Sequence, residues 1–227
     1  MTQKWYLRNT TATVTVTAGN QSTALEGART LGANNATGTD ETRSLNSAKG
    51  AAQTSLTKAG DASTAERMNY LCRFTSPAIQ AGTYGSGTWG IALALNESNA
   101  NANSFLNVSI YFWNPAGSVR GFIYDSGTDI GTEWANAETG EVNNITGANV
   151  TASEGDVLVI EIWRHCTTQG MATAYNQIVY FDGTTDPTDG TATSDAASYI
   201  NAPADIPEYV APVTTIPGTP LLLLGVG

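Results

Sequence analysis

The sequence predicts an all-β protein, an antiparallel two-sheet sandwich of the jelly-roll type with an extended N-terminal region and a proline-rich C-terminal tail. Short segments carry apolar residues at every second position, turn-forming residues separate them, and no useful length shows a helical period. Charged residues make up only 13% of the chain, against a usual share of about 25%. The abundant Thr, Asn and Gly that replace them favour strands and turns.

Residues 1–66 are expected to form a strand pair followed by an extended arm with loops. Trp5 and Leu7 alternate with Tyr6 and Arg8, and the period of two continues through residues 12–17. From residue 18 to 65 small polar residues and glycines dominate, so this stretch cannot bury much apolar surface by itself. Residues 44–52 alternatively form one or two helical turns.

The core of the sandwich is expected between residues 67 and 183. The separators of its strands, such as ESNANANS, NPAGS and SEGD, are typical of turns. The chain of 227 residues fits one all-β sandwich domain. Strands are predicted at residues 68–75, 88–96, 105–114, 121–124, 141–146, 156–164 and 173–181.

Residues 184–227 are expected to form an extended tail laid over a surface. Six prolines between positions 187 and 220 exclude a long helix and favour extended backbone. The tail ends in an apolar run, and such a run needs a cover from the same chain or from a neighbour. This run comprises Leu221, Leu222, Leu223 and Leu224.

The charge distribution argues against nucleic acid and membrane partners. The formal net charge is -10, and the ten Lys and Arg residues are scattered with no two adjacent, so the basic patch that binds phosphates is missing. No apolar stretch approaches the length that spans a bilayer, and the first residues do not read as a signal peptide. We therefore expect a chain made in a cytoplasm.

The search for catalytic residues starts from His165, the single histidine. Its neighbour Cys166 must point to the opposite face of a strand, so the two cannot form a dyad. Cys72 shares a predicted strand face with Tyr70 and Phe74 and is interpreted as a buried apolar residue; free thiols are favoured over a Cys72–Cys166 disulfide. We expect no enzymatic activity.

Two groups of carboxylates are candidates for a calcium site and for a catalytic acid pair. Asp182, Asp186, Asp189 and Asp195 lie among glycines, which can indicate calcium but is also typical of turns; the turn interpretation is favoured, and no cofactor is expected. Acid pairs for glycoside hydrolysis were sought among Glu133, Glu138, Glu141 and Glu161. Glu161 lies mid-strand, and strand alternation predicts that it faces solvent.

Aromatic residues offer a further surface. Tyr111, Trp113, Tyr124 and Trp134 can line a sugar-binding face, but the strand around Tyr111 is apolar on both sides, so a partner subunit or the chain's own arm can cover it equally well. Among these alternatives we predict an interface with other subunits. Its residues are Trp5, Tyr6, Tyr111, Trp113, Leu221, Leu222, Leu223 and Leu224.

Two segments carry a resemblance to a protein family. They are ESNANANSFLNVSIYFWNPAGSVRGFIYDSGTDIGTEWANAETG and EGDVLVIEIWRHCTTQGMATAYNQIVYFDGTTDPTDGTATSDAASYINAP. Over residues 71–203 the chain resembles a group of uncharacterised structural (virion) proteins of tailed bacteriophages and prophages. The most telling parts are GDVLVIEIW and YFDGTTD.

The resemblance implies a virion location and no particular reaction. It implies other virion proteins as partners, either the major capsid protein or tail and neck proteins, and a homo-oligomer is expected. A capsid decoration or cementing role ranks first, because the chain is short and acidic and lacks the heptads or long repeats of fibre shafts. A tail, neck or baseplate protein and a carbohydrate- or receptor-binding module remain the alternatives.

Overall fold

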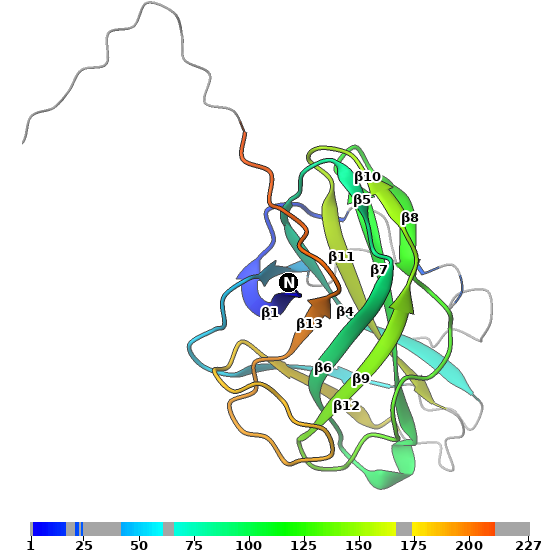
Figure 1. Cartoon of the computed structure of the whole chain (residues 1–227). Coiled ribbons are helices and arrows are strands. Elements are labelled where there is room, and N and C mark those ends of the chain that lie inside the picture. The colour runs from blue at the N-terminus through cyan, green and yellow to red at the C-terminus, as the bar shows by residue number, and fades with distance from the viewer. Residues whose placement is uncertain are drawn as a thin grey trace, which may run out of the picture.

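The computed structural model describes residues 2–16, 21, 22, 24, 42–60, 66–166 and 174–211. The elements that can be bounded within these residues are thirteen strands and one 3-10 helix, η1 (Ala100–Ala102), so the predicted all-β class is confirmed (Figure 1). The strands are β1 (Gln3–Thr11), β2 (Thr42–Asn46), β3 (Thr54–Ala59), β4 (Arg67–Ala78), β5 (Gly82–Tyr84), β6 (Gly87–Glu97), β7 (Ser104–Asn114), β8 (Ser118–Tyr124), β9 (Thr139–Gly147), β10 (Val150–Ala152), β11 (Val157–Cys166), β12 (Asn176–Phe181) and β13 (Tyr199–Ala202).

One large sheet supplies both layers of the sandwich. Its strand order is β3-β12-β6-β13-β1-β2-β4-β11-β7-β8, and β9 pairs with the other side of β6. The strands β4, β11, β7 and β8 form one layer, and β6, β9 and β12 lie across the core from it (Figure 1). The sheet is mixed and not wholly antiparallel as predicted, because β2 runs parallel to β4. A second, two-stranded sheet joins β10 to β5.

The two layers meet through a large apolar core. Trp89, Phe112 and Ile160 belong to its main cluster and are at most 1% exposed. Phe74 of β4 contacts Phe181 of β12 edge to face, with ring centroids 5.3 Å apart. Aromatic contacts of this kind join elements that are distant in sequence and stabilise the packing of one layer on the other.

A β-bulge in β4 changes which side chains share a face. The register against β11 shifts between Ile162, opposite Cys72, and Trp163, opposite Tyr70, so Leu71 is an extra residue in the ladder. Cys72 packs in the main core, whereas Tyr70 packs with Trp163 in a separate cluster. The predicted face shared by Cys72 and Tyr70 is therefore wrong, because strict alternation stops at the bulge.

Strands also form outside the segment predicted to be the core. Residues 44–52 form no helical turn; Ser44 pairs in β2 with Thr75. The predicted strand pair at the N-terminus is not formed either, because β1 pairs with β13 and β2 and the chain leaves the sheet after Thr11. Because β2 pairs with β4 and β13 pairs with β6, the sheet extends across the expected boundaries of the core at residues 66 and 183. The apolar run 221–224 lies outside the described residues.

Candidate functional site

An N-terminal strap lies on the face of the β4–β11–β7–β8 layer that points away from the main core, here called the outer face. The strap comprises the described residues 12–16, 21, 22 and 24. Its apolar part is Val16, which is fully buried in one cluster with Tyr111 and Trp113, and Val14, which packs against that cluster. The hydroxyl of Thr75 donates to the carbonyl of Val14 at 3.2 Å. The chain therefore covers the second apolar side of β7 with its own N-terminal segment.

Glu161 lies in the middle of the outer face and is fully buried. Arg73 donates to its Oε1 from Nη2 at 2.6 Å and from Nε at 3.1 Å. The hydroxyl of Tyr111 donates to Oε1 at 2.9 Å, and the indole N–H of Trp163 donates to Oε2 at 3.3 Å. Burial, then the Glu161 charge, raise the pKa of Tyr111 well above its usual value, so the phenol stays a donor. A buried charge needs this set of partners to be tolerated.

The strap completes the hydrogen bonding of two carboxylates through its main chain. The N–H of Gln21 donates to Glu161, at 3.1 Å to Oε1 and 3.3 Å to Oε2. Asp125, directly after β8, accepts from the N–H of Ala24 at 3.0 Å and from the hydroxyls of Ser22 and Ser109. Charge-assisted bonds to main-chain N–H groups are strong and largely independent of side-chain identity. The outer face is thus a site that binds the main chain of the N-terminal segment.

The predicted solvent exposure of Glu161 is wrong, although the alternation behind it is right. Glu161 does lie on the face opposite the core, but the strap covers that face. A signal was present in the sequence, since Arg73 and Glu161 are opposite charges within strands that otherwise read as apolar. Two such residues in neighbouring strands indicate a cross-strand ion pair.

His165 is held between two carboxylates on the same face. Its Nδ1 lies 2.8 and 2.9 Å from the carboxylate oxygens of Asp129, and its Nε2 lies 2.8 Å from Oε1 of Glu66. The thiol of Cys166 instead donates to the carbonyl of Ala102 at 3.3 Å. The prediction that His165 and Cys166 point to opposite faces is confirmed, and both Cys72 and Cys166 are free and buried.

Four of the residues predicted to form an interface are buried within this chain, and the other four, Leu221 to Leu224, lie outside the described residues. Trp5, Tyr111 and Trp113 are at most 1% exposed, and Tyr6 is 8% exposed. Trp5 packs in the main core, and Tyr111 and Trp113 lie beneath the strap. Of the aromatic face considered for sugar, Trp134 is also buried, whereas Tyr124 is half-buried.

The aspartates after β12 are bound by the chain itself. Arg8 donates to Asp182, and Lys4 and Lys49 pair with Asp186 at 2.8 and 3.0 Å. Burial raises the pKa of Asp186, but the two lysines outweigh it and lower the pKa overall. Within the described residues, no group of His, Cys, Asp or Glu is arranged to hold a metal ion.

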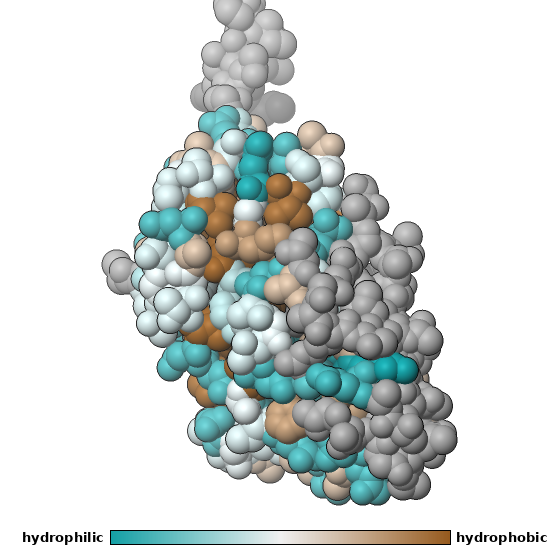
Figure 2. Space-filling model, turned by 90° about the vertical axis from the view of Figure 1, so that its right-hand side faces the viewer, coloured by the Kyte–Doolittle hydropathy of each residue, from teal (hydrophilic) through white to brown (hydrophobic). Residues whose placement is uncertain are grey.

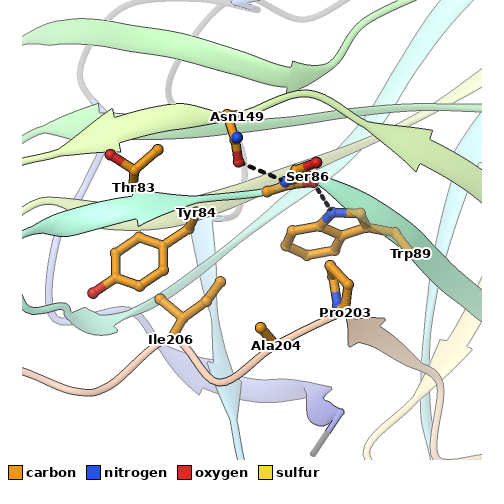
Figure 3. A pocket seen from close by; sticks show the side chains of 9 residues that line it. Thr83, Tyr84, Ser86, Trp89, Asn149, Pro203, Ala204 and Ile206 are labelled. Carbon is orange, nitrogen blue, oxygen red and sulfur yellow. Dashed lines mark hydrogen bonds between the residues drawn. The ribbon is translucent and has the colours of Figure 1, made fainter.

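A small hollow of about 100 Å³ lies beside the start of β6 (Figure 3). Trp89, Tyr84 and Pro203 provide apolar walls, and Asn149 accepts a hydrogen bond from the N–H of Ser86 at 3.1 Å. The indole N–H of Trp89 donates to the carbonyl of Gly85 at 2.8 Å. The hollow combines aromatic surface with polar groups at its rim.

A second hollow, of about 260 Å³, brings together acids that are distant in sequence. Glu133, Glu141 and Asp189 line it. Burial raises the pKa of Glu141, while hydrogen bonds from Thr132 and Asn143 lower it and the charge of Asp189 raises it further. Of the four glutamates considered for an acid pair, Glu133 and Glu141 are the two that meet here.

No family model matches the chain, and no curated protein matches it. Similar solved structures include two of a CocE/NonD family hydrolase from Staphylococcus aureus. Their identities are 10% and 9% and their TM-scores 0.43 and 0.44, over 70% and 89% of this chain and 34% and 36% of the hydrolase. The chain thus spans about a third of the length of these proteins.

Viral structures are also among the similar ones. The structure of infectious bursal disease virus, Gx strain, matches at 12% identity and a TM-score of 0.29, over 68% of this chain and 33% of that chain. The VP2 subviral particle of the same virus matches at 8% identity and a TM-score of 0.17, over 66% of this chain and 40% of that chain. These structures come from infectious bursal disease virus and not from a tailed phage.

The prediction that the chain is not an enzyme is contradicted by the hydrolase structures, and we withdraw it. TM-scores below 0.5 at about 10% identity assign neither an activity nor a substrate to this chain. In the described part of the chain, no helix has the length and apolar character needed to cross a membrane.

Proposed function

We propose that the chain is a structural protein of a viral particle, and specifically a tailed-phage virion protein that decorates or cements the capsid through its terminal segments. The observation that carries the proposal is the strap, which is fixed to the outer face by main-chain hydrogen bonds to Glu161 and Asp125. A face that binds extended backbone is what an assembly protein needs in order to hold arms. The resemblance over residues 71–203 supports the same setting.

The C-terminal tail is the segment proposed to reach neighbouring particle proteins. The described part ends at residue 211, next to Val210, which is 80% exposed, and the sequence beyond it contains the four leucines 221–224. Apolar side chains on a free tail are unfavourable in water, so their burial against a neighbour stabilises the assembled state. Other copies of this chain and the major capsid, tail or neck proteins are the proposed partners, and the virion is the proposed location.

Truncation tests this role. Deleting residues 214–227 is expected to leave a folded sandwich and to reduce the amount of protein retained on purified particles. Replacing Leu221, Leu222, Leu223 and Leu224 with Ser is the finer variant, and Val210→Ser, an exposed change outside the run, is the control. Normal retention of both tail variants contradicts the proposal. The position of the protein in purified particles, seen by labelling or density, separates a head location from a tail, neck or baseplate location.

A carbohydrate- or receptor-binding module is the second candidate, and the hollow beside Trp89 favours it (Figure 3). Aromatic walls with polar rim groups occur in small-ligand sites, and this hollow is smaller than the usual roughly 300–1,000 Å³ of such a site, so it fits part of one sugar ring at most. Binding to a glycan array that is lost in Tyr84→Ala, with the fold intact, supports this candidate. Absence of binding to any glycan in the array contradicts it.

A further inference from the structure

The sandwich has an open side, where its sheet ends. β8 is the last strand of the sheet order, and β9 has β6 as its strand partner on one side alone. Among the described residues, the outer edges of β8 and of β9 from residue 143 to 146 pair with no further strand, although β10 lies beside β8 and the carbonyl of Ile123 accepts from Ala148. The opposite side of the sandwich is continuous through β13, β1 and β2. Free strand edges carry backbone donors and acceptors that can pair with another chain.

A groove of about 460 Å³ runs between these two edges. We call it the β8–β9 groove. One hydrogen bond, from the N–H of Ala148 to the carbonyl of Ile123 at 2.8 Å, joins its two sides. Figure 2 shows this side of the molecule, with apolar residues in patches among polar ones. The groove is lined by Phe122, Ile123, Tyr124, Asp125, Ser126, Thr146 and Ala148.

The charge of the groove favours an uncharged apolar occupant. Its lining has one ionisable carboxylate, Asp125, which already accepts hydrogen bonds from Ser109 and Ala24. Phe122 and Tyr124 are half-buried and offer aromatic surface. The net charge of -10 makes two copies of the chain repel one another on average, so a contact surface with few charges is favoured.

The chain contains a segment of this chemistry outside the described structure. Residues 212–227 have no charged side chain, and residues 221–226, Leu-Leu-Leu-Leu-Gly-Val, contain no proline. A proline-free apolar segment can add to a strand edge through its main chain, whereas Pro217 and Pro220 cannot donate to such a ladder. The segment also needs a cover for its four leucines.

The direction of the tail points to a second copy as the owner of the groove. Tyr209 is held by a hydrogen bond from its N–H to the carbonyl of Ala78 at 2.7 Å. The described tail then runs to residue 211 at the top of the body, on the side away from the β8 edge (Figure 1). We propose that residues 221–226 of one copy bind in the β8–β9 groove of another copy. This inference names a partner for the tail. Its biological role depends on the proposed assembly function, but the contact between two copies does not.

Complementation of two defective variants of the full chain tests the exchange. The groove variant carries Thr146→Arg and Ala148→Arg, two exposed positions at which the arginines block the groove. The tail variant carries Leu222→Asp and Leu224→Asp, which place charges in the apolar segment. The purified wild-type chain is expected to self-associate in sedimentation, and each variant by itself is expected to lose this association by at least tenfold in dissociation constant. A mixture of the two variants retains one intact groove and one intact tail and is expected to recover one-to-one pairs.

A disulfide assay reports the contact directly. Ala148→Cys and Gly225→Cys are introduced on separate copies, and the buried native thiols of Cys72 and Cys166 keep the background low. A cross-linked dimer that forms only when both variants are mixed supports the proposal. A monomeric wild-type chain, association that survives either pair of substitutions, or a cross-link within a doubly substituted chain alone overturns it. Because no particle is present, failure here leaves the proposed virion role to its own test.

Discussion

Replacing Glu161 with Gln removes the negative charge at the centre of the outer face and takes from the buried Arg73 the carboxylate that faces it on β11. The side chains of Arg73 and Glu161 are 1% and 0% exposed, so solvent does not screen the loss. At an effective dielectric constant of about 20 and a charge separation of about 4 Å, the lost attraction is about 4 kcal/mol. This agrees with the roughly 3–5 kcal/mol measured when one partner of a buried pair is removed.

Urea unfolding followed by tryptophan fluorescence measures this effect. With a dependence on urea of about 2 kcal/mol per M, a loss of about 4 kcal/mol lowers the midpoint by about 2 M. Glu133→Gln is the matched control, since Glu133 is exposed and its change should stay within about 0.5 kcal/mol. Arg73→Met should cost a similar amount to Glu161→Gln. The double variant should cost about 2–3 kcal/mol less than the sum of the two.

Two results would refute this reasoning. A change below about 1 kcal/mol for Glu161→Gln would mean that water or a structural shift compensates the buried charge of Arg73. A double variant whose loss equals the sum of the single losses would mean that the two side chains do not interact energetically.

Three further predictions concern pH, the strap and the thiols. Burial raises the pKa of the Glu97 carboxyl from 4.5 to about 6, so the folded state binds a proton on Glu97 more tightly than the unfolded state does. The free energy of unfolding therefore falls by on the order of 2 kcal/mol as the pH rises between these two values. The stability difference between wild type and Glu97→Gln should change by this amount between pH 4.5 and pH 7.5, and an equal difference at both pH values contradicts the prediction. Val16→Ala removes two buried methyl groups and should cost about 2 kcal/mol in urea, against no change for Val210→Ala; an unchanged midpoint would mean that Val16 does not pack on β7. A thiol reagent should label neither Cys72 nor Cys166 in the folded chain and both after unfolding, and rapid labelling of the native protein would contradict their burial.

Local patterns were sufficient for the strands of the middle of the chain. The segments predicted at 68–75, 105–114 and 156–164 correspond to β4, β7 and β11 within a few residues. This agreement has a physical reason, because alternation and turn-forming residues act over a few neighbours and need no knowledge of the rest of the fold. Short strands such as β2 and β13 carry few apolar residues and form because neighbours in the sheet complete their hydrogen bonds.

The candidate site could be predicted only in part. Sequence alternation placed Tyr111 and Trp113 on a second apolar face that needs a cover, and the structure supplies the cover from Val14 and Val16. The main-chain bonds from the strap to Glu161 and Asp125 were not predictable, because polar segments without periodicity do not indicate where they bind. The hollow at Glu141 likewise depends on the meeting of β9 with residues 131–135 and 189–190.

By itself, the sequence determined the all-β class, the longer strands between residues 67 and 181 but not β5 and β10, the opposite orientations of His165 and Cys166, and a chain without a cluster of basic residues. These follow from local period, turn chemistry and charge count. Only the tertiary structure decided that Glu161 is buried, that Leu71 forms a bulge and that the sandwich is continuous on one side and open at β8 and β9. Each of these depends on contacts between residues distant along the chain, and burial is a property of such contacts.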